Sequence, residues 1–247
     1  MRVAADQAYV LHRYPYGETS LLLELLTRHH GRVAVIAKGV RKPKSTRRAL
    51  LDPFVPLQAG WSGRGEVATL GSLEAEAAGP VYSGERIFCG FYLNELLLRL
   101  LHRHDPHERL FDAYAQAVAA LADPARDQGA VLRVFEKRLL EEVGYGLVLT
   151  HEVADNAPIT SAGRYRYLPD QGPVPEATAG GAGIAVSGAT LLALAAEDLI
   201  EVEALSEAKR LMRQLLAPHL GGKPLQSRRL FEWVHGLAAR EPEGELQ

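Results

Sequence analysis

Cysteine is nearly absent from this chain, which holds one, Cys89, among 247 residues. A single thiol excludes an intramolecular disulfide and every zinc site built from two or four cysteines. Such usage is typical of proteins in a reducing cytoplasm. Charged residues interrupt the longest apolar runs, and residues 1–7 lack the apolar core of a signal peptide. We therefore expect no membrane segment and no secretion signal.

Motifs of covalent chemistry are also missing. Residues 221–224 (GGKP) lack the earlier glycine and the following Ser/Thr that a phosphate-binding loop needs. The histidine-rich segment 102–107 has ligand types for a metal, but Pro106 breaks the helical geometry that would align them. We expect no catalytic residue, no metal and no cofactor. A metal hydrolase centred on His102, His104 and His107 stays open as an alternative.

Charge is distributed unevenly along the chain, although the formal net charge is only −2. Residues 1–64 hold 11 Lys/Arg against 4 Asp/Glu, while residues 65–247 hold 17 against 26. The excess of cations is concentrated in residues 38–48 (KGVRKPKSTRR), where six of eleven residues are basic and none is acidic. This asymmetry indicates two modules with different partners.

The hydrophobic pattern changes period near residue 83. Before it, alternation and turn residues predict five short strands, and five strands in about 75 residues indicate an OB-fold barrel. After it, helical spacing predicts six helices. The fold class is α+β, with a barrel domain at 1–80 and an α-helical domain at 81–247. The segment at about 151–188 is rich in Gly, Pro and Ala, and we expect an irregular insert there, with residues 165–168 as a candidate short strand. The strands are expected at 7–12, 19–27, 32–38, 54–61 and 66–70, and the helices at 83–105, 108–121, 130–143, 188–196, 205–216 and 227–237.

The basic segment 38–48 lies between two predicted strands, so we expect a cationic loop on the barrel. Such a loop can follow a phosphate backbone and release counterions. The alternative is that the basic residues only form a charged surface in contact with water. Aromatic residues of the barrel are candidates for stacking on single-stranded bases, although most should be core. The expected phosphate contacts are Arg32, Lys38, Arg41, Lys42, Lys44, Arg47 and Arg48. The stacking candidates are Tyr14, Tyr16, Phe54 and Trp61.

The predicted helix at 130–143 carries basic residues beside apolar ones. Arg133, Lys137 and Arg138 flank Phe135 and Leu140. An apolar groove with a basic rim suits an acidic, hydrophobic peptide end. A plain amphipathic core helix explains the same pattern, and the sequence leaves both readings open.

Six segments carry motifs in a characteristic order: 10–20 (VLHRYPYGETS), 30–33 (HGRV), 37–41 (AKGVR), 135–140 (FEKRLL), 144–146 (GYG) and 223–231 (KPLQSRRLF). Together they resemble the RecO recombination-mediator family over roughly residues 5–235. Many members have a four-cysteine zinc site in the helical domain. Residues 151–188 contain no cysteine, so the chain resembles a zinc-free branch.

The resemblance implies a non-enzymatic DNA repair protein with an OB-fold and a helical domain. It implies binding of single- and double-stranded DNA, annealing of complementary strands, binding of the SSB C-terminal tail, and joining RecR to load RecA. It also implies a bacterial cytoplasmic location, with association to the nucleoid during repair. An OB-fold RNA-binding protein of the ribosome is the alternative. The residues expected at the SSB tail are Arg133, Phe135, Lys137 and Leu140. A second DNA-facing surface is expected from Arg210, Arg213, Lys223, Arg228 and Arg229.

Overall fold

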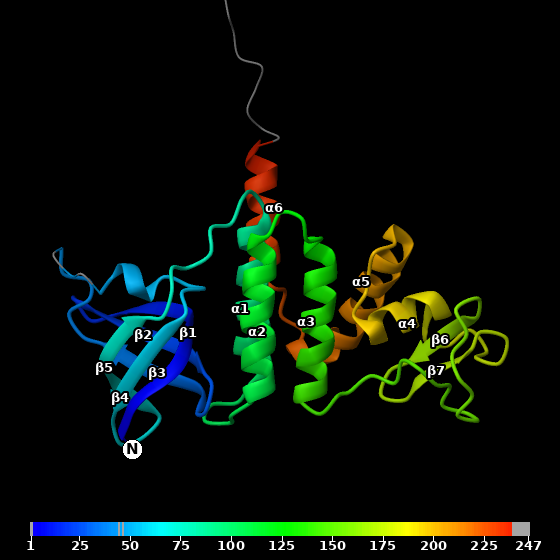
Figure 1. Cartoon of the computed structure of the whole chain (residues 1–247), viewed down its shortest axis with the longest axis horizontal. Coiled ribbons are helices and arrows are strands. Elements are labelled where there is room, and N and C mark those ends of the chain that lie inside the picture. The colour runs from blue at the N-terminus through cyan, green and yellow to red at the C-terminus, as the bar shows by residue number, and fades with distance from the viewer. Residues whose placement is uncertain (1, 44, 46, 239–247) are drawn as a thin grey trace, which may run out of the picture. The chain divides into compact units, whose positions relative to one another are not determined.

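The computed structural model describes residues 2–43, 45 and 47–238 (Figure 1). Contacts divide the chain into two compact units, residues 1–108 with 223–247 and residues 109–222. The predicted boundary at residue 80 follows chain order, whereas the contacts group α1 (Arg86–Leu100) and α6 (Gln226–Ala238) with the barrel. No helix in the described part of the chain combines the length and hydropathy needed to cross a bilayer.

The first unit contains a closed barrel with strand order β1-β2-β3-β5-β4. All neighbouring strands are antiparallel except β3 and β5, which are parallel. This strand count, order and closure confirm the predicted OB-type barrel and the α+β class. The strands are β1 (Arg2–Tyr16), β2 (Ser20–Thr27), β3 (Gly31–Ala37), β4 (Leu57–Ser62) and β5 (Val67–Ala75).

Alternating apolar residues fill the barrel, since side chains of a strand point to opposite faces in turn. Val10, Leu23 and Val35 are among its buried core residues. β1 is longer than predicted, because residues expected to form a turn continue the β1–β2 ladder to Tyr16. Pro15 is tolerated there because β4 pairs only with the start of β1 and leaves this end unpaired on one side.

The β2–β3 turn is held on two sides. The buried Asp6 carboxylate on β1 hydrogen-bonds Nδ1 of both His29 and His30, each at 2.7 Å. Gly31 has a φ of +66°, and a Cβ there would lie 2.1 Å from the carbonyl oxygen of Asp105. Only glycine therefore fits this position.

Helix α6 is attached to α1 by hydrogen bonds at its N-terminus. The Glu95 carboxylate accepts from the backbone N–H groups of Gln226 and Ser227, each at 2.9 Å, and from Ser227 Oγ at 2.8 Å. Arg99 donates to the carbonyl oxygens of Lys223 and Pro224 at 2.6 and 2.8 Å. A carboxylate at a helix N-terminus accepts hydrogen bonds from N–H groups that have no partner within the helix. Its negative charge also interacts favourably with the positive end of the helix dipole.

The second unit packs helices against a small sheet. Its elements are α2 (Glu108–Ala122), α3 (Gln128–Glu142), β6 (Arg164–Leu168), β7 (Gly172–Pro175), β8 (Ile184–Ser187), α4 (Gly188–Ala196) and α5 (Val202–Leu216). The sheet has the order β7-β6-β8, and one core cluster joins Tyr165 and Val186 to Leu191 and Leu211.

The candidate strand at 165–168 is confirmed as β6, but the irregular chain expected around it is wrong where β7 and β8 form and complete this sheet. In β8 the inward residues Ile184 and Val186 alternate over too few positions to stand out in the sequence. The prolines of β7 are allowed because β7 is an edge strand.

Candidate functional site

The basic loop leaves β3 after Ala37 and ends in a 3₁₀ turn at Ala49–Leu51. Its described cations are all exposed, and none of them forms an ion pair within the described residues. Asp52, the first acid after the loop, pairs instead with Arg13 on β1 at 2.6 Å. The loop therefore presents unneutralised positive charge to solvent. These cations are Lys38, Arg41, Lys42, Arg47 and Arg48, while Lys44 lies outside the described residues.

Arg41 fixes one end of the loop. Its backbone N–H donates to the carbonyl oxygen of Thr19 at 2.8 Å, and its guanidinium donates to that of Gly17 at 3.0 Å. Both acceptors lie in the β1–β2 turn, so the start of the loop is held beside that turn.

A hollow of about 680 Å³ lies between the loop and the turn. Lys38 and Lys42 line it together with Tyr16, whose side chain is half exposed. Tyr14 is also half exposed, whereas Phe54 and Trp61 are buried in the unit and present no ring to a ligand. Two of the four stacking candidates thus lie at the surface. The remaining lining residues are Thr19, Ser20, Ile36, Gly39 and Thr69.

Arg32 does not lie on this cationic surface. Its Nε lies 3.5 Å from the buried Glu24 carboxylate, and Nη1 donates to the carbonyl oxygen of Leu98. Arg103 pairs with the same carboxylate. Burial lowers the pKa of Arg32, and the Glu24 charge offsets part of that effect. The Arg32 side chain therefore links β3 to Glu24 of β2 and to the last turn of α1.

The predicted C-terminal cations are divided between the two units. Arg210 and Arg213 lie on α5, whereas Lys223, Arg228 and Arg229 belong to the unit that contains the barrel. All five are exposed. Arg210 donates to the carbonyl oxygen of Ala185 at 2.6 Å, and Arg228 pairs with Glu232 at 3.0 Å.

The residues expected at the SSB tail lie inside the second unit. Arg133 is 7% exposed and donates to the buried Glu136 at 2.6 Å. Lys137 contacts Glu197 at 3.0 Å, and Leu140 belongs to the core cluster. Only Phe135 lines an open hollow.

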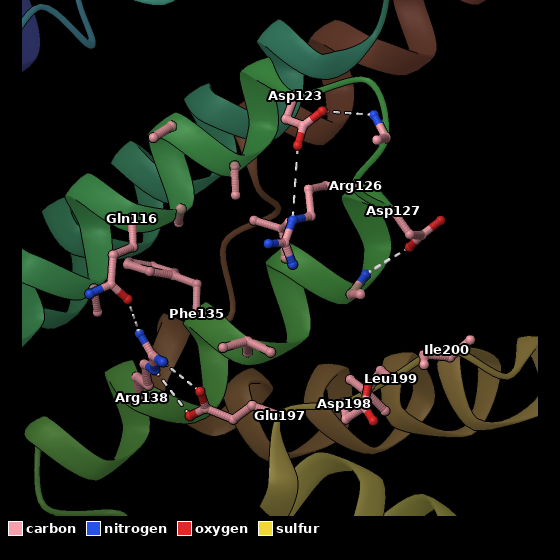
Figure 2. A pocket seen from close by; sticks show the side chains of 18 residues that line it. Gln116, Asp123, Arg126, Asp127, Phe135, Arg138, Glu197, Asp198, Leu199 and Ile200 are labelled. Carbon is pink, nitrogen blue, oxygen red and sulfur yellow. Dashed lines mark hydrogen bonds and ion pairs between the residues drawn. The ribbon is translucent and has the colours of Figure 1, made fainter.

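This α2–α3 hollow has a volume of about 790 Å³ (Figure 2). Ala113, Ala117 and Ala120 of α2 form one wall, where their short side chains leave space beside Phe135. Ile200 adds an exposed apolar residue at the opposite side. The full lining is Ala113, Gln116, Ala117, Ala119, Ala120, Asp123, Ala125, Arg126, Asp127, Ala130, Val131, Val134, Phe135, Arg138, Glu197, Asp198, Leu199 and Ile200.

Two arginines line the α2–α3 hollow. Arg138 donates to Glu197 Oε1 at 3.0 Å and to Gln116 Oε1 at 2.7 Å, which fixes its guanidinium on the lining (Figure 2). The hydrogen bond from Arg138 lowers the pKa of Glu197, so this acid stays charged at neutral pH. Arg126 is more exposed, with Nε 4.0 Å from Asp123. The hollow thus combines an apolar wall with one exposed cation, Arg126, and one cation held by hydrogen bonds, Arg138.

Acids also line the α2–α3 hollow, but backbone N–H groups engage two of them. Asp127 caps α3 by accepting from the Ala130 N–H at 2.8 Å, and Asp123 accepts from the Ala125 N–H at 2.9 Å. Sequence reasoning missed Arg126 and Ile200. The alanines spaced three and four residues apart on α2 were the available signal of a hollow.

The histidine-rich segment does not assemble a metal site. Within residues 2–238, apart from 44 and 46, no group of three His, Cys, Asp or Glu side chains is arranged to hold an ion. His107 instead lies 3.4 Å from Asp105.

Comparison with known proteins finds matches over both halves of the chain. Residues 1–78 match the family described as "Recombination protein O N terminal", and residues 82–229 match "Recombination protein O C terminal". The "DNA repair protein RecO" of Nitrosococcus oceani is 48% identical over 237 residues, 96% of each chain. That of Methylococcus capsulatus is 50% identical over 230 residues, 93% of each chain. That of Dechloromonas aromatica is 48% identical over 238 residues, which cover 96% of this chain and 98% of the relative.

Proposed function

The chain belongs to the RecO family of DNA repair proteins, and on that premise we propose that it binds single- and double-stranded DNA through the basic loop of its barrel. It acts in the cytoplasm by binding and positioning strands, without covalent chemistry. The observation that carries this proposal is the row of exposed loop cations that lack an acidic partner in the described structure.

The physical basis of the proposal is counterion release. Each phosphate that Lys or Arg neutralises frees condensed cations, so affinity falls steeply as salt rises. Annealing requires two polyanions to approach each other, and the loop cations reduce that repulsion. Tyr16 lines the hollow between the basic loop and the β1–β2 turn together with Lys38 and Lys42. A base can stack on the Tyr16 ring while the phosphate of the same nucleotide contacts the two lysines.

The test of DNA binding is a charge reversal confined to the loop. The triple variant Lys42→Glu, Arg47→Glu, Arg48→Glu is expected to lose about 100-fold in affinity for single-stranded DNA and to show a shallower salt dependence. Arg41 is left intact because it ties the loop to the β1–β2 turn. Fluorescence anisotropy of a labelled oligonucleotide over a salt series measures both quantities.

The matched control is Arg2→Glu, Arg64→Glu, Arg109→Glu, which changes the net charge equally at exposed sites outside the loop. An equal loss in the control and the loop variant would contradict a specific role for the loop. An RNA oligonucleotide of the same sequence forms the third arm. A clear preference for RNA over DNA would favour the ribosomal alternative.

We further propose that the α2–α3 hollow receives the acidic C-terminal tail of SSB, and that the protein joins RecR in promoting RecA loading. Support comes from the apolar wall with Phe135 and from Arg126, which is exposed beside it. Apolar tail residues would pack on the wall while the tail carboxylates contact the guanidinium groups. Of the four residues expected for this role, Phe135 lines the α2–α3 hollow, where it is 1% exposed and supports the alanine wall.

The test of the tail site uses exposed residues, so that folding is not disturbed. Ile200→Ser and Arg126→Glu are each expected to weaken binding of an SSB-tail peptide about fivefold, because each removes one contact worth about 1 kcal/mol. Val202→Ser is the control, since Val202 is 75% exposed against 73% for Ile200 and does not line the hollow. Unchanged peptide affinity by calorimetry in both hollow variants would remove the tail from this site.

A further inference from the structure

The second half of α6 extends beyond its contacts with α1. Glu95 holds the N-terminus of α6, and further along Phe231 meets Phe88 with ring centroids 5.7 Å apart. The two helices therefore run antiparallel, and Phe88 is already in the first turn of α1, which begins at Arg86. Helix α6 continues to Ala238, past the start of its neighbour (Figure 1).

This projecting part exposes one apolar face. Leu230, Trp233 and Val234 are exposed, and their spacing of three and four residues places them side by side. Trp233 is 62% exposed and contacts no aromatic ring within the described residues. An indole exposed to this extent suits binding of a partner, and no ring or ion pair among the described residues occupies it.

An unpaired cation lies one helical turn from the indole in the described part of α6. Arg229 lies one helical turn before Trp233, is exposed and has no ion pair in the part of the chain that the structure describes. Lys223, three residues before α6 begins, is also exposed and has no ion pair in that part of the chain. The nearby acid, Glu232, is paired with Arg228 at 3.0 Å. The face therefore combines a flat aromatic ring with Arg229, whose charge no acid among the described residues neutralises.

We propose that this α6 face is a binding site for single-stranded nucleic acid, in which Trp233 stacks on an unpaired base and Arg229 contacts the adjacent phosphate. Charge complementarity selects a polyanion, and the exposed ring selects one whose bases are free to stack. The inference rests on the proposed DNA-binding function and adds a second contact to that of the barrel loop.

Tryptophan fluorescence tests the stacking directly. The chain has two tryptophans, and Trp61 is only 3% exposed, so a stacking base reports through Trp233. An oligothymidylate of about 15 nucleotides is expected to quench the emission of the full-length protein. An abasic oligonucleotide of the same length keeps the phosphates without bases and is expected to quench little. Trp233→Phe is expected to remove most of the quenching.

Affinity measurements separate stacking from charge. Trp233→Ala is expected to weaken oligothymidylate binding about tenfold and leave the abasic oligonucleotide unaffected, while Trp233→Phe keeps most of the affinity. Arg229→Gln is expected to weaken both ligands. Ile87→Ala, an exposed apolar truncation on α1, is the control and should change neither. Thermal melting checks that each variant is folded.

Equal quenching by the abasic oligonucleotide, or unchanged affinity in Trp233→Ala, would overturn the inference. So would a fall in molar mass by light scattering in Trp233→Ala, which would make the face an interface between copies. If the loop variant loses binding while Trp233→Ala does not, this inference fails and the proposed function stands. If the unaltered protein binds no DNA at low salt, both fail.

Discussion

Arg133 and Arg47 illustrate how location determines the role of the same side chain. Arg47 lies on the exposed loop without an ion pair in the described structure. Arg133 is 7% exposed and pairs with Glu136, which is 1% exposed. A charge held inside a fold depends on its partner, because an unpaired buried ion loses hydration without compensation. Arg133 therefore serves stability.

Truncation of Arg133 tests this role. Arg133→Ala is expected to lower the free energy of unfolding by about 3 kcal/mol, because it leaves the buried Glu136 without its cation. Urea denaturation followed by circular dichroism measures the change. Binding of an SSB-tail peptide to the folded fraction is expected to stay unchanged, since Arg133 does not line the α2–α3 hollow.

The double variant Arg133→Met, Glu136→Met separates pairing from packing. Removing both charges together avoids the uncompensated ion, so its loss of stability is expected to be smaller than that of Arg133→Ala. A larger loss in the double variant would show that the aliphatic packing of these side chains, rather than their pairing, stabilises α3.

Among the elements, helices were predicted well and short strands less well. Helix α4 occupies the predicted residues 188–196, because apolar spacing and the N-cap Ser187 are local features. β7 and β8 have four residues each and were not predicted, since so short a segment carries little periodicity. Such strands form because β6 lies between them and the unit's core covers their inward side chains.

Helix α6 depends on a tertiary contact that its own sequence does not contain. Burial raises the pKa of Glu95, but the hydrogen bonds from Ser227 and Gln226 and the charge of Arg99 outweigh it, so the net pKa is lowered. A lowered carboxyl pKa stabilises the fold above the unfolded-state value of about 4.5, and this contribution disappears as pH falls through the folded-state pKa.

We therefore expect Glu95→Ala to cost about 2 kcal/mol at pH 7, from the loss of charged hydrogen bonds to α6. The difference from the unaltered protein should begin to shrink below about pH 4.5, where Glu95 of the unfolded chain is protonated, and should disappear as pH falls through the lower folded-state pKa. Chemical denaturation at several pH values measures it. Glu74→Ala, at an exposed position on β5, is the control and should change little. A difference that does not vary with pH would contradict a role for the charge.

For the whole molecule, the asymmetry of charge is smaller between the packed units than along the chain, because residues 65–108, with 3 Lys/Arg against 7 Asp/Glu, belong to the unit of the barrel. The unit of residues 1–108 and 223–247 holds 18 Lys/Arg against 15 Asp/Glu, and residues 109–222 hold 10 against 15. The cationic unit thus contains both the barrel loop and α6, the two surfaces proposed to contact DNA. The acidic unit contains the hollow proposed for the SSB tail. We therefore expect the steep salt dependence of DNA affinity to arise from the unit of residues 1–108 and 223–247.

The sequence by itself determined the family, the barrel-then-helices order and the exposed basic loop, because motifs, periodicity and runs of one charge are local properties. Only the tertiary structure decided that Arg32 and Arg133 are partnered inside the fold and that alanines of α2 open a hollow beside Phe135. It also joined α6 to the barrel unit and left Trp233 exposed. These outcomes depend on which faces meet across long sequence separations, and a residue's own neighbours in the chain do not encode that.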